Sequence, residues 1–121
     1  MLKLDDQTAA SLELEPAGLM REPWGTVLDG PMAMSRRELW RSTDGRISVG
    51  VWECESGRFR TLFDGEGEHI RIIAGAMICT SSDGDVTELG PGDSMTFPPG
   101  WSGTWDVRAP LRKIFCGFKA S

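Results

Sequence analysis

Turn-forming residues divide this chain into short apolar runs, and this division limits the available folds more than any other feature. The 15 glycines and 7 prolines are spread along the chain, whereas periodicity typical of amphipathic helices is scarce. The runs expected to form strands are 47–54, 58–63, 69–73, 76–81, 85–89, 94–97, 104–107 and 112–118. Seven or eight short strands joined by close turns predict an all-β domain, a sandwich or a jelly-roll barrel.

The first 34 residues follow a different pattern. Pro16, Pro23 and Pro31 preclude a long helix, because proline breaks helical hydrogen bonding. We therefore divide the chain into an N-terminal arm, 1–34, and a barrel, 35–121, and expect the arm to lie over the barrel or over a partner subunit. The stretch MSRRELW that follows fits either one helical turn or an edge strand.

Length and charge exclude several classes of protein. The 121 residues suit one domain, and a formal net charge of -5 argues against a nucleic-acid or anionic-membrane partner. No apolar run approaches the roughly 20 residues that span a bilayer. The N-terminus carries acidic residues where a signal peptide needs basic ones, so we expect a cytoplasmic protein.

The three cysteines are predicted to be buried free thiols. Cys54, Cys79 and Cys116 are widely spaced, odd in number and placed in apolar runs, which argues against a disulfide or a metal site. A nucleophilic cysteine needs an adjacent base. The only histidine, His69, is not placed near any of them by the sequence.

Three stretches carry a resemblance to a known family. They are GVWECESGRFR at 50–60, Glu68 followed seven residues later by Gly75, and GPGDSMTFPPGWSGTWDV at 90–107 with Lys113 after it. The spacing of Gly92, Pro98 and Gly100 fits the second cupin motif. Over residues 21–118 the chain resembles small single-domain cupins, a DUF861-like subfamily related to the cupin domains of ureidoglycine aminohydrolase and of ethanolamine-utilisation proteins. The resemblance implies a cupin-type jelly-roll barrel and a homodimer.

The metal ligands that this resemblance implies are mostly missing. Metal-binding cupins use two histidines and a glutamate from the first motif and one histidine from the second. Glu68 stands at the glutamate position, but no histidine precedes it at 61–64, and Gly103 takes the place of the second-motif histidine. One carboxylate alone does not hold a transition metal tightly. We therefore predict no metal and no cofactor, leaving open a weak hard-cation site at Asp64 and Glu68.

Two residues are candidates for catalysis. Glu68 fits a general acid or base, or an anchor for a ligand amine, and equally fits a structural ion pair with Arg60 or Lys113. In strand 112–118, Lys113 shares a face with Phe115 and Gly117, and the resembling subfamily usually carries a lysine there. The alternative for Lys113 is an edge position facing solvent.

The remaining candidates are aromatic or basic. Trp52, Trp101 and Trp105 fit either stacking on a ligand or packing in the core. Arg58 and Arg60 alternate with Phe59 and Thr61 and share a face, where they either grip a carboxylate or form a solvated surface. The absence of tyrosine disfavours the metal-free epimerase mechanism of some cupin-like enzymes.

Three functional hypotheses follow. The first is a metal-independent cupin that binds a small polar or carboxylate-bearing metabolite inside the barrel. The second is an enzyme similar to ureidoglycine aminohydrolase, acting on a small ureido or amino compound. The third is a structural or regulatory subunit. The residues predicted to bind the ligand are Arg60, Trp52, Trp105, Glu68 and Lys113, with Glu68 and Lys113 also candidates for catalysis.

Overall fold

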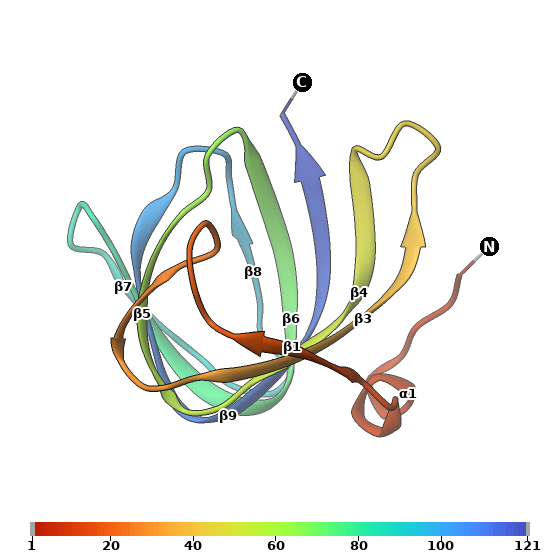
Figure 1. Cartoon of the computed structure of the whole chain (residues 1–121), viewed down its shortest axis with the longest axis horizontal. Coiled ribbons are helices and arrows are strands. Elements are labelled where there is room, and N and C mark those ends of the chain that lie inside the picture. Colours follow the sequence, from red (N-terminus) through yellow and green to blue (C-terminus); the bar gives the residue numbers. More distant parts are fainter. Residues whose placement is uncertain (1, 121) are drawn as a thin grey trace.

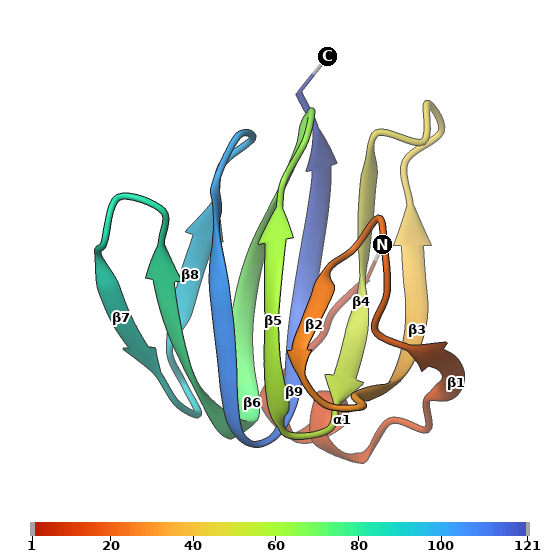
Figure 2. The ribbon, with the colours of Figure 1, turned by 60° about the vertical axis from the view of Figure 1, so that its left-hand side comes forward.

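The structure is a single curled β-sheet, preceded by one short helix near the N-terminus of the chain (Figures 1 and 2). A computed structural model describes residues 2–120. Its elements are α1 (Asp6–Ser11), β1 (Glu15–Leu19), β2 (Thr26–Asp29), β3 (Ala33–Arg41), β4 (Ile47–Cys54), β5 (Gly57–Leu62), β6 (Glu66–Ser81), β7 (Val86–Leu89), β8 (Ser94–Phe97) and β9 (Ser102–Lys119). The predicted all-β class is confirmed. No helix in residues 2–120 is long and apolar enough to cross a membrane.

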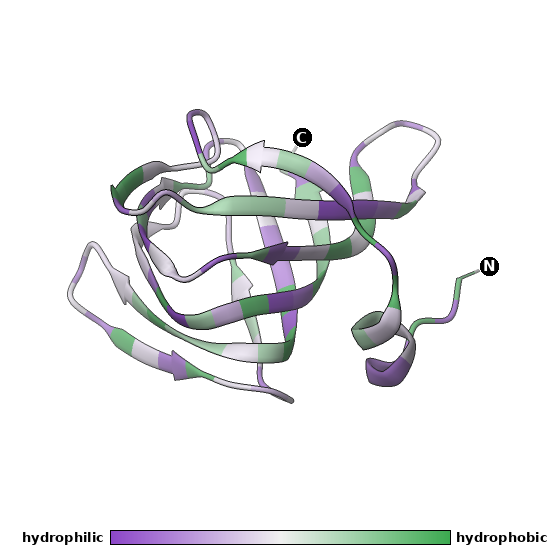
Figure 3. Ribbon diagram, turned by 60° about the horizontal axis from the view of Figure 1, so that its bottom comes forward, coloured by the Kyte–Doolittle hydropathy of each residue, from purple (hydrophilic) through white to green (hydrophobic). Residues whose placement is uncertain are grey.

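All nine strands belong to one sheet, which curls into the barrel. Along the main path the order is β1-β3-β4-β9-β5-β2, and β6 pairs with β7, β8 and β9. Hydropathy alternates along the strands (Figure 3), because successive side chains point to opposite faces of a strand. The apolar face therefore turns inward when the sheet curls.

Residues 15–29 take part in this sheet. β1 pairs with β3, and β2 pairs with β5, so the segment predicted as an arm contributes one strand at each end of the path. The ambiguous stretch at 34–40 lies in β3 and is a strand. β3 is not an edge strand, since β1 and β4 flank it.

Two long strands, β6 and β9, form the spine of the barrel. The sequence predicted two separate strands within the range of β6 and two within the range of β9. In the structure each range is one strand, and the pairing of β6 with β9 is irregular near Gly75. There Gly75 adopts a φ of 92°, and a Cβ on it would lie 2.2 Å from the carbonyl oxygen of Pro110. The bulge changes the phase of alternation, because the buried positions move from Ile70 and Ile72 to Met77 and Cys79.

The N-terminal helix is held against this spine by two arginines. Arg71 on β6 donates two hydrogen bonds to the carboxylate of Asp6, at 2.7 and 2.6 Å. Arg112 on β9 donates to the carbonyl oxygens of Ala9 and Leu12, both at 2.9 Å. Unpaired carbonyl groups at the end of α1 are thereby satisfied, and the segment is anchored beside the barrel.

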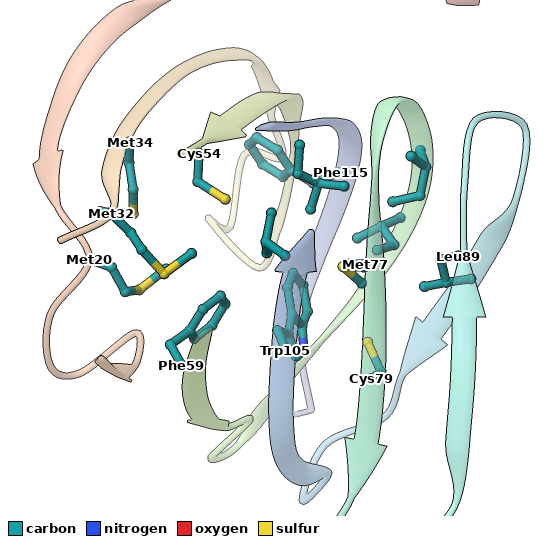
Figure 4. Close-up of a cluster of buried hydrophobic side chains, with 14 of the residues drawn as sticks. Met20, Met32, Met34, Cys54, Phe59, Met77, Cys79, Leu89, Trp105 and Phe115 are labelled. Atoms are coloured by element: carbon teal, nitrogen blue, oxygen red, sulfur yellow. The ribbon is translucent and has the colours of Figure 1, made fainter. Parts of the chain in front are cut away.

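The core combines aromatic rings with sulfur-containing side chains. Phe97, Ile70, Ile72 and Leu111 are fully buried on the inner face. Methionine fills irregular space well because its side chain is unbranched and flexible. The labelled side chains in Figure 4 are the core residues Met20, Met32, Met34, Cys54, Phe59, Met77, Cys79, Leu89, Trp105 and Phe115.

Gly103 marks a close approach between β9 and β6, and it yields a stability prediction. A Cβ at this position would lie 2.2 Å from the carbonyl oxygen of Thr80 and 2.8 Å from the ring of Trp101. We expect Gly103→Ala to destabilise the fold by about 1–3 kcal/mol, since backbone must shift to make room. Gly90→Ala is the control, because no atom lies within 4 Å of its added Cβ. Urea denaturation measures both, and equal stability of the two variants would contradict the close approach.

Candidate functional site

The inner face of the barrel carries a buried ion pair. Lys113 on β9 donates a hydrogen bond from Nζ to Oε1 of Glu68 on β6. The Lys113 side chain is 6% exposed, whereas that of Glu68 is 20% exposed. Water therefore reaches the carboxylate more readily than the ammonium group. Of the two ion-pair partners proposed for Glu68 from sequence, the structure selects Lys113.

Two tryptophans complete the surroundings of the lysine. The Lys113 Nζ lies 4.6 Å from the ring centroid of Trp52 and 4.7 Å from that of Trp105. The negative faces of indole rings attract a cation, by about 2 kcal/mol or more when water is excluded. The ammonium group therefore has both a carboxylate and aromatic faces as partners.

The two tryptophans are held differently. Trp52 lies on β4 opposite Lys113 and is half-buried. Trp105 is 2% exposed and packs against Phe59 and Phe97, with ring centroids 5.3 and 4.9 Å away. Its Nε1 is buried and has no hydrogen-bond acceptor among residues 2–120. Trp105 therefore faces Lys113 with its ring rather than with its N–H group.

A cavity of about 560 Å³ opens beside the ion pair, which is within the size range of small-molecule sites. Its rim includes residues of the β3–β4 and β5–β6 loops and of the C-terminal end of β9, at the upper end of the barrel in Figure 1. Its walls combine apolar and polar groups. Lining residues include Arg36, Trp52, Phe59, Glu68, Trp105 and Lys113.

The structure brings four of the five predicted ligand-binding residues to this cavity, namely Trp52, Trp105, Glu68 and Lys113. Arg60 is not among the lining residues. It is exposed, whereas its neighbours Phe59 and Thr61 are buried, so Arg60 points away from the interior.

Three other residues considered from the sequence do not take part in the ion pair of Glu68 and Lys113. Trp101 packs edge-to-face on Phe97, with ring centroids 4.9 Å apart. His69 is exposed and its Nδ1 lies 2.8 Å from the hydroxyl of Thr96, on the strand face opposite to Glu68. Asp64 lines the cavity, but no group of three metal-ligating side chains exists among residues 2–120.

Arg36 on β3 is a cavity residue that the sequence analysis did not identify. The sequence of residues 34–40 fits a helical turn as well as a strand, so the sequence alone does not decide which way the Arg36 side chain points. A strand with Met34 inside would also have placed Arg36 inside, because residues two apart share a face. The period-two relation to Met34 was the available signal.

Comparisons with known proteins identify the family. The model of the EutQ-like cupin domain matches residues 41–115, more than half of the chain. The chain belongs to the EutQ-like cupin family. The predicted cupin barrel and the resemblance to ethanolamine-utilisation cupins are thereby confirmed. No curated protein matches the sequence.

Solved structures agree with this cupin fold. The EutQ protein of Clostridium difficile is 18% identical, with a TM-score of 0.62 over 74% of this chain and 65% of its own. A DUF861-family protein of unknown function from Pseudomonas syringae pv. tomato is 16% identical, with a TM-score of 0.76 over 94% of this chain and 46% of its own. Ectoine synthase from P. lautus is 16% identical, with a TM-score of 0.65, and the match covers 77% of this chain and 68% of the synthase. At these identities the likeness shows the fold, which hosts different functions.

The site does not fit the metal centre implied by the cupin resemblance. The carboxylate at the ligand position, Glu68, is already paired with the ammonium group of Lys113. The position of the missing second-motif histidine, Gly103, is closed by the backbone of Thr80 and the ring of Trp101. An internal cation thus neutralises the carboxylate that would bind the metal.

The ion pair is expected to contribute strongly to stability. Glu68→Gln leaves the Lys113 ammonium group buried without its counter-charge. Breaking a fully buried pair lowers the free energy of unfolding by about 3–5 kcal/mol. We expect a smaller loss here because water reaches Glu68. A double-mutant cycle with Lys113→Met should give a coupling energy above about 1 kcal/mol. The control is Glu53→Gln, which breaks the pair of Glu53 and Arg112, with Glu53 41% exposed. Chemical denaturation measures all variants, and a cost for Glu68→Gln no larger than the control would contradict a stabilising pair.

Chemical labelling of the cysteines tests the burial of Cys54 and Cys79 in the core. Burial raises the pKa of the Cys54 and Cys79 thiols to about 12, and the charge of Lys113 opposes this rise only in part. Since the thiolate is the reactive form, about one such thiol in ten thousand is ionised at pH 8. Iodoacetamide at pH 8 should therefore label only Cys116, which is half-buried, in the folded protein. Mass spectrometry after denaturation should show all three labelled, and rapid native labelling of Cys54 or Cys79 would refute the buried assignment.

Proposed function

We propose that this chain is a metal-independent, small-molecule-binding cupin whose ligand occupies the cavity beside Glu68 and Lys113. The observation that carries the proposal is the charged pair held at the wall of a cavity with aromatic surroundings. Such a combination of apolar walls with a few polar groups is typical of ligand sites. The class of ligand we favour is a small polar or carboxylate-bearing metabolite.

Catalysis is the second candidate. Glu68 is hydrogen-bonded to Lys113, and both residues line the cavity, so a proton donor and acceptor stand together near a bound ligand. This arrangement supports a metal-free proton transfer on a small ureido or amino compound. It gives the predicted similarity to ureidoglycine aminohydrolase a mechanism that needs no metal, although the reaction class stays a proposal.

An interaction role is the third candidate. Several large apolar side chains are exposed, including Trp24 at 51% and Trp40 at 44%. Trp24 also lines the cavity, so its exposure has an alternative explanation. The homodimer and the cytoplasmic location stay predictions from the sequence.

The ligand proposal predicts a dependence on Glu68. Thermal-shift measurements with a panel of small carboxylates, amides and amines should find compounds that raise the melting temperature of the wild type. Glu68→Gln should reduce the shifts given by amines and amides by at least half, since these compounds lose a charged hydrogen-bond acceptor. The shifts given by carboxylates should increase, because a repelling charge is removed and Lys113 loses its partner. The matched control is Glu88→Gln on β7, because Glu88 is exposed and does not line the cavity.

Two results would contradict the proposal. The first is an absence of stabilising compounds for the wild type across the panel. The second is an equal shift in Glu68→Gln and the wild type, which would place binding elsewhere. Metal content is measured by mass spectrometry on protein purified without chelator or histidine tag, and one metal per chain would overturn the metal-independent part.

A further inference from the structure

A row of three cavity residues crosses the sheet at one level. Arg36 on β3 lies opposite Trp52 on β4, and Trp52 lies opposite Lys113 on β9. Directly opposite residues of paired strands project to the same face. All three residues line the cavity, so two cationic groups flank one indole ring on the inner face.

The two cations of this row differ in what they bind. Lys113 is paired with Glu68. Arg36 is exposed and has no ion pair or side-chain hydrogen bond with any of residues 2–120. Its guanidinium carbon lies 5.3 Å from the ring centroid of Phe115. A guanidinium group stacked on a ring keeps its edge N–H groups available, and their planar fork matches a carboxylate.

The charges around the cavity favour an anion. The lining cations are Arg36, Arg41, Arg46, Lys113 and Lys119, and the lining anions are Asp64, Glu66 and Glu68. Arg41 is also paired with Glu38 at 2.8 Å, so with Glu38 counted the described groups around the cavity leave one excess positive charge, whereas the whole chain has a net charge of -5. A positively charged cavity in an acidic protein attracts anions against the field of the rest of the molecule.

The aromatic walls indicate the shape of the ligand. Trp52 is half-buried and lies between Arg36 and Lys113 in the row. Phe115 and Phe59 line the same cavity. Aromatic faces stack well on planar groups and less well on bulky saturated ones.

We propose that Arg36 is the specificity-determining residue of the cavity and selects a small planar monocarboxylate. The Arg36 guanidinium binds the carboxylate, and the planar body lies along Trp52 toward Lys113 and Glu68. The assignment rests on the proposed function, because it names the ligand class and the anchoring residue of that same site.

The test compares matched probes and matched arginines. Isothermal titration calorimetry measures benzoate and sorbate, their primary amides, and benzylamine against wild type, Arg36→Gln and Arg60→Gln. Arg60 is also an exposed strand arginine but points away from the cavity. The wild type should bind each acid more tightly than its amide by about tenfold or more, and Arg36→Gln should weaken acid binding by about 10–100-fold. Amide binding to Arg36→Gln and acid binding to Arg60→Gln should stay unchanged.

Arg36→Lys separates charge from geometry. Lysine keeps the positive charge but lacks the planar fork, so this variant should recover only part of the affinity for benzoate. Melting curves recorded by circular dichroism check that each variant is folded. Full recovery by Arg36→Lys would overturn the bidentate anchoring.

The remaining outcomes distinguish this assignment from the proposed function. Equal affinities for acids and amides, or equal losses in Arg36→Gln and Arg60→Gln, would overturn the role of Arg36 while a cavity ligand remains established. If none of the five probes binds the wild type but another compound of the panel stabilises it through Glu68, the planar-acid class is wrong and the binding function stands. If no compound binds in either experiment, both proposals fail.

Discussion

The ion pair of Lys113 and Glu68 is the interaction around which the inner face of the barrel is organised. A buried ammonium group is costly unless its charge is compensated, and here a carboxylate and two indole rings share that task. These partners come from β4, β6 and β9, so the pair links the two long strands to their neighbour. The same contact occupies the carboxylate that stands at the metal-ligand position of the cupin motif.

A cavity beside a neutralised pair has a different chemistry from a metal centre. A metal ion presents a concentrated positive charge with open coordination positions, whereas the pair of Lys113 and Glu68 has little net charge of its own. The excess positive charge around this cavity therefore comes from the arginines and Lys119 rather than from the paired lysine. Arg36 is the one arginine that also lies in a row with Trp52 and Lys113, which is why ligand selection is assigned to it.

Much of the fold was predictable because strand signals are local. The strand at 47–54 coincides with β4, and alternation placed Lys113 on the same face as Phe115, where both are buried. The same alternation paired Arg58 with Arg60 but did not decide which face was inside. The burial of Phe59 and Thr61 decides it, and turns both arginines outward. Continuity of β6 through Gly75 was not predictable either, since a glycine within a strand signals a break as readily as a bulge.

The sequence by itself determined the all-β class, the turns and the absence of histidines from the cupin metal positions, because each depends on residue types at fixed local spacings. Only the tertiary structure decided that Glu68 pairs with Lys113 and that Arg36 joins the cavity while Arg60 leaves it. These facts depend on which strands become neighbours and in which register. Residues 36, 52, 68 and 113 are far apart along the chain, and local periodicity carries no information about such pairing.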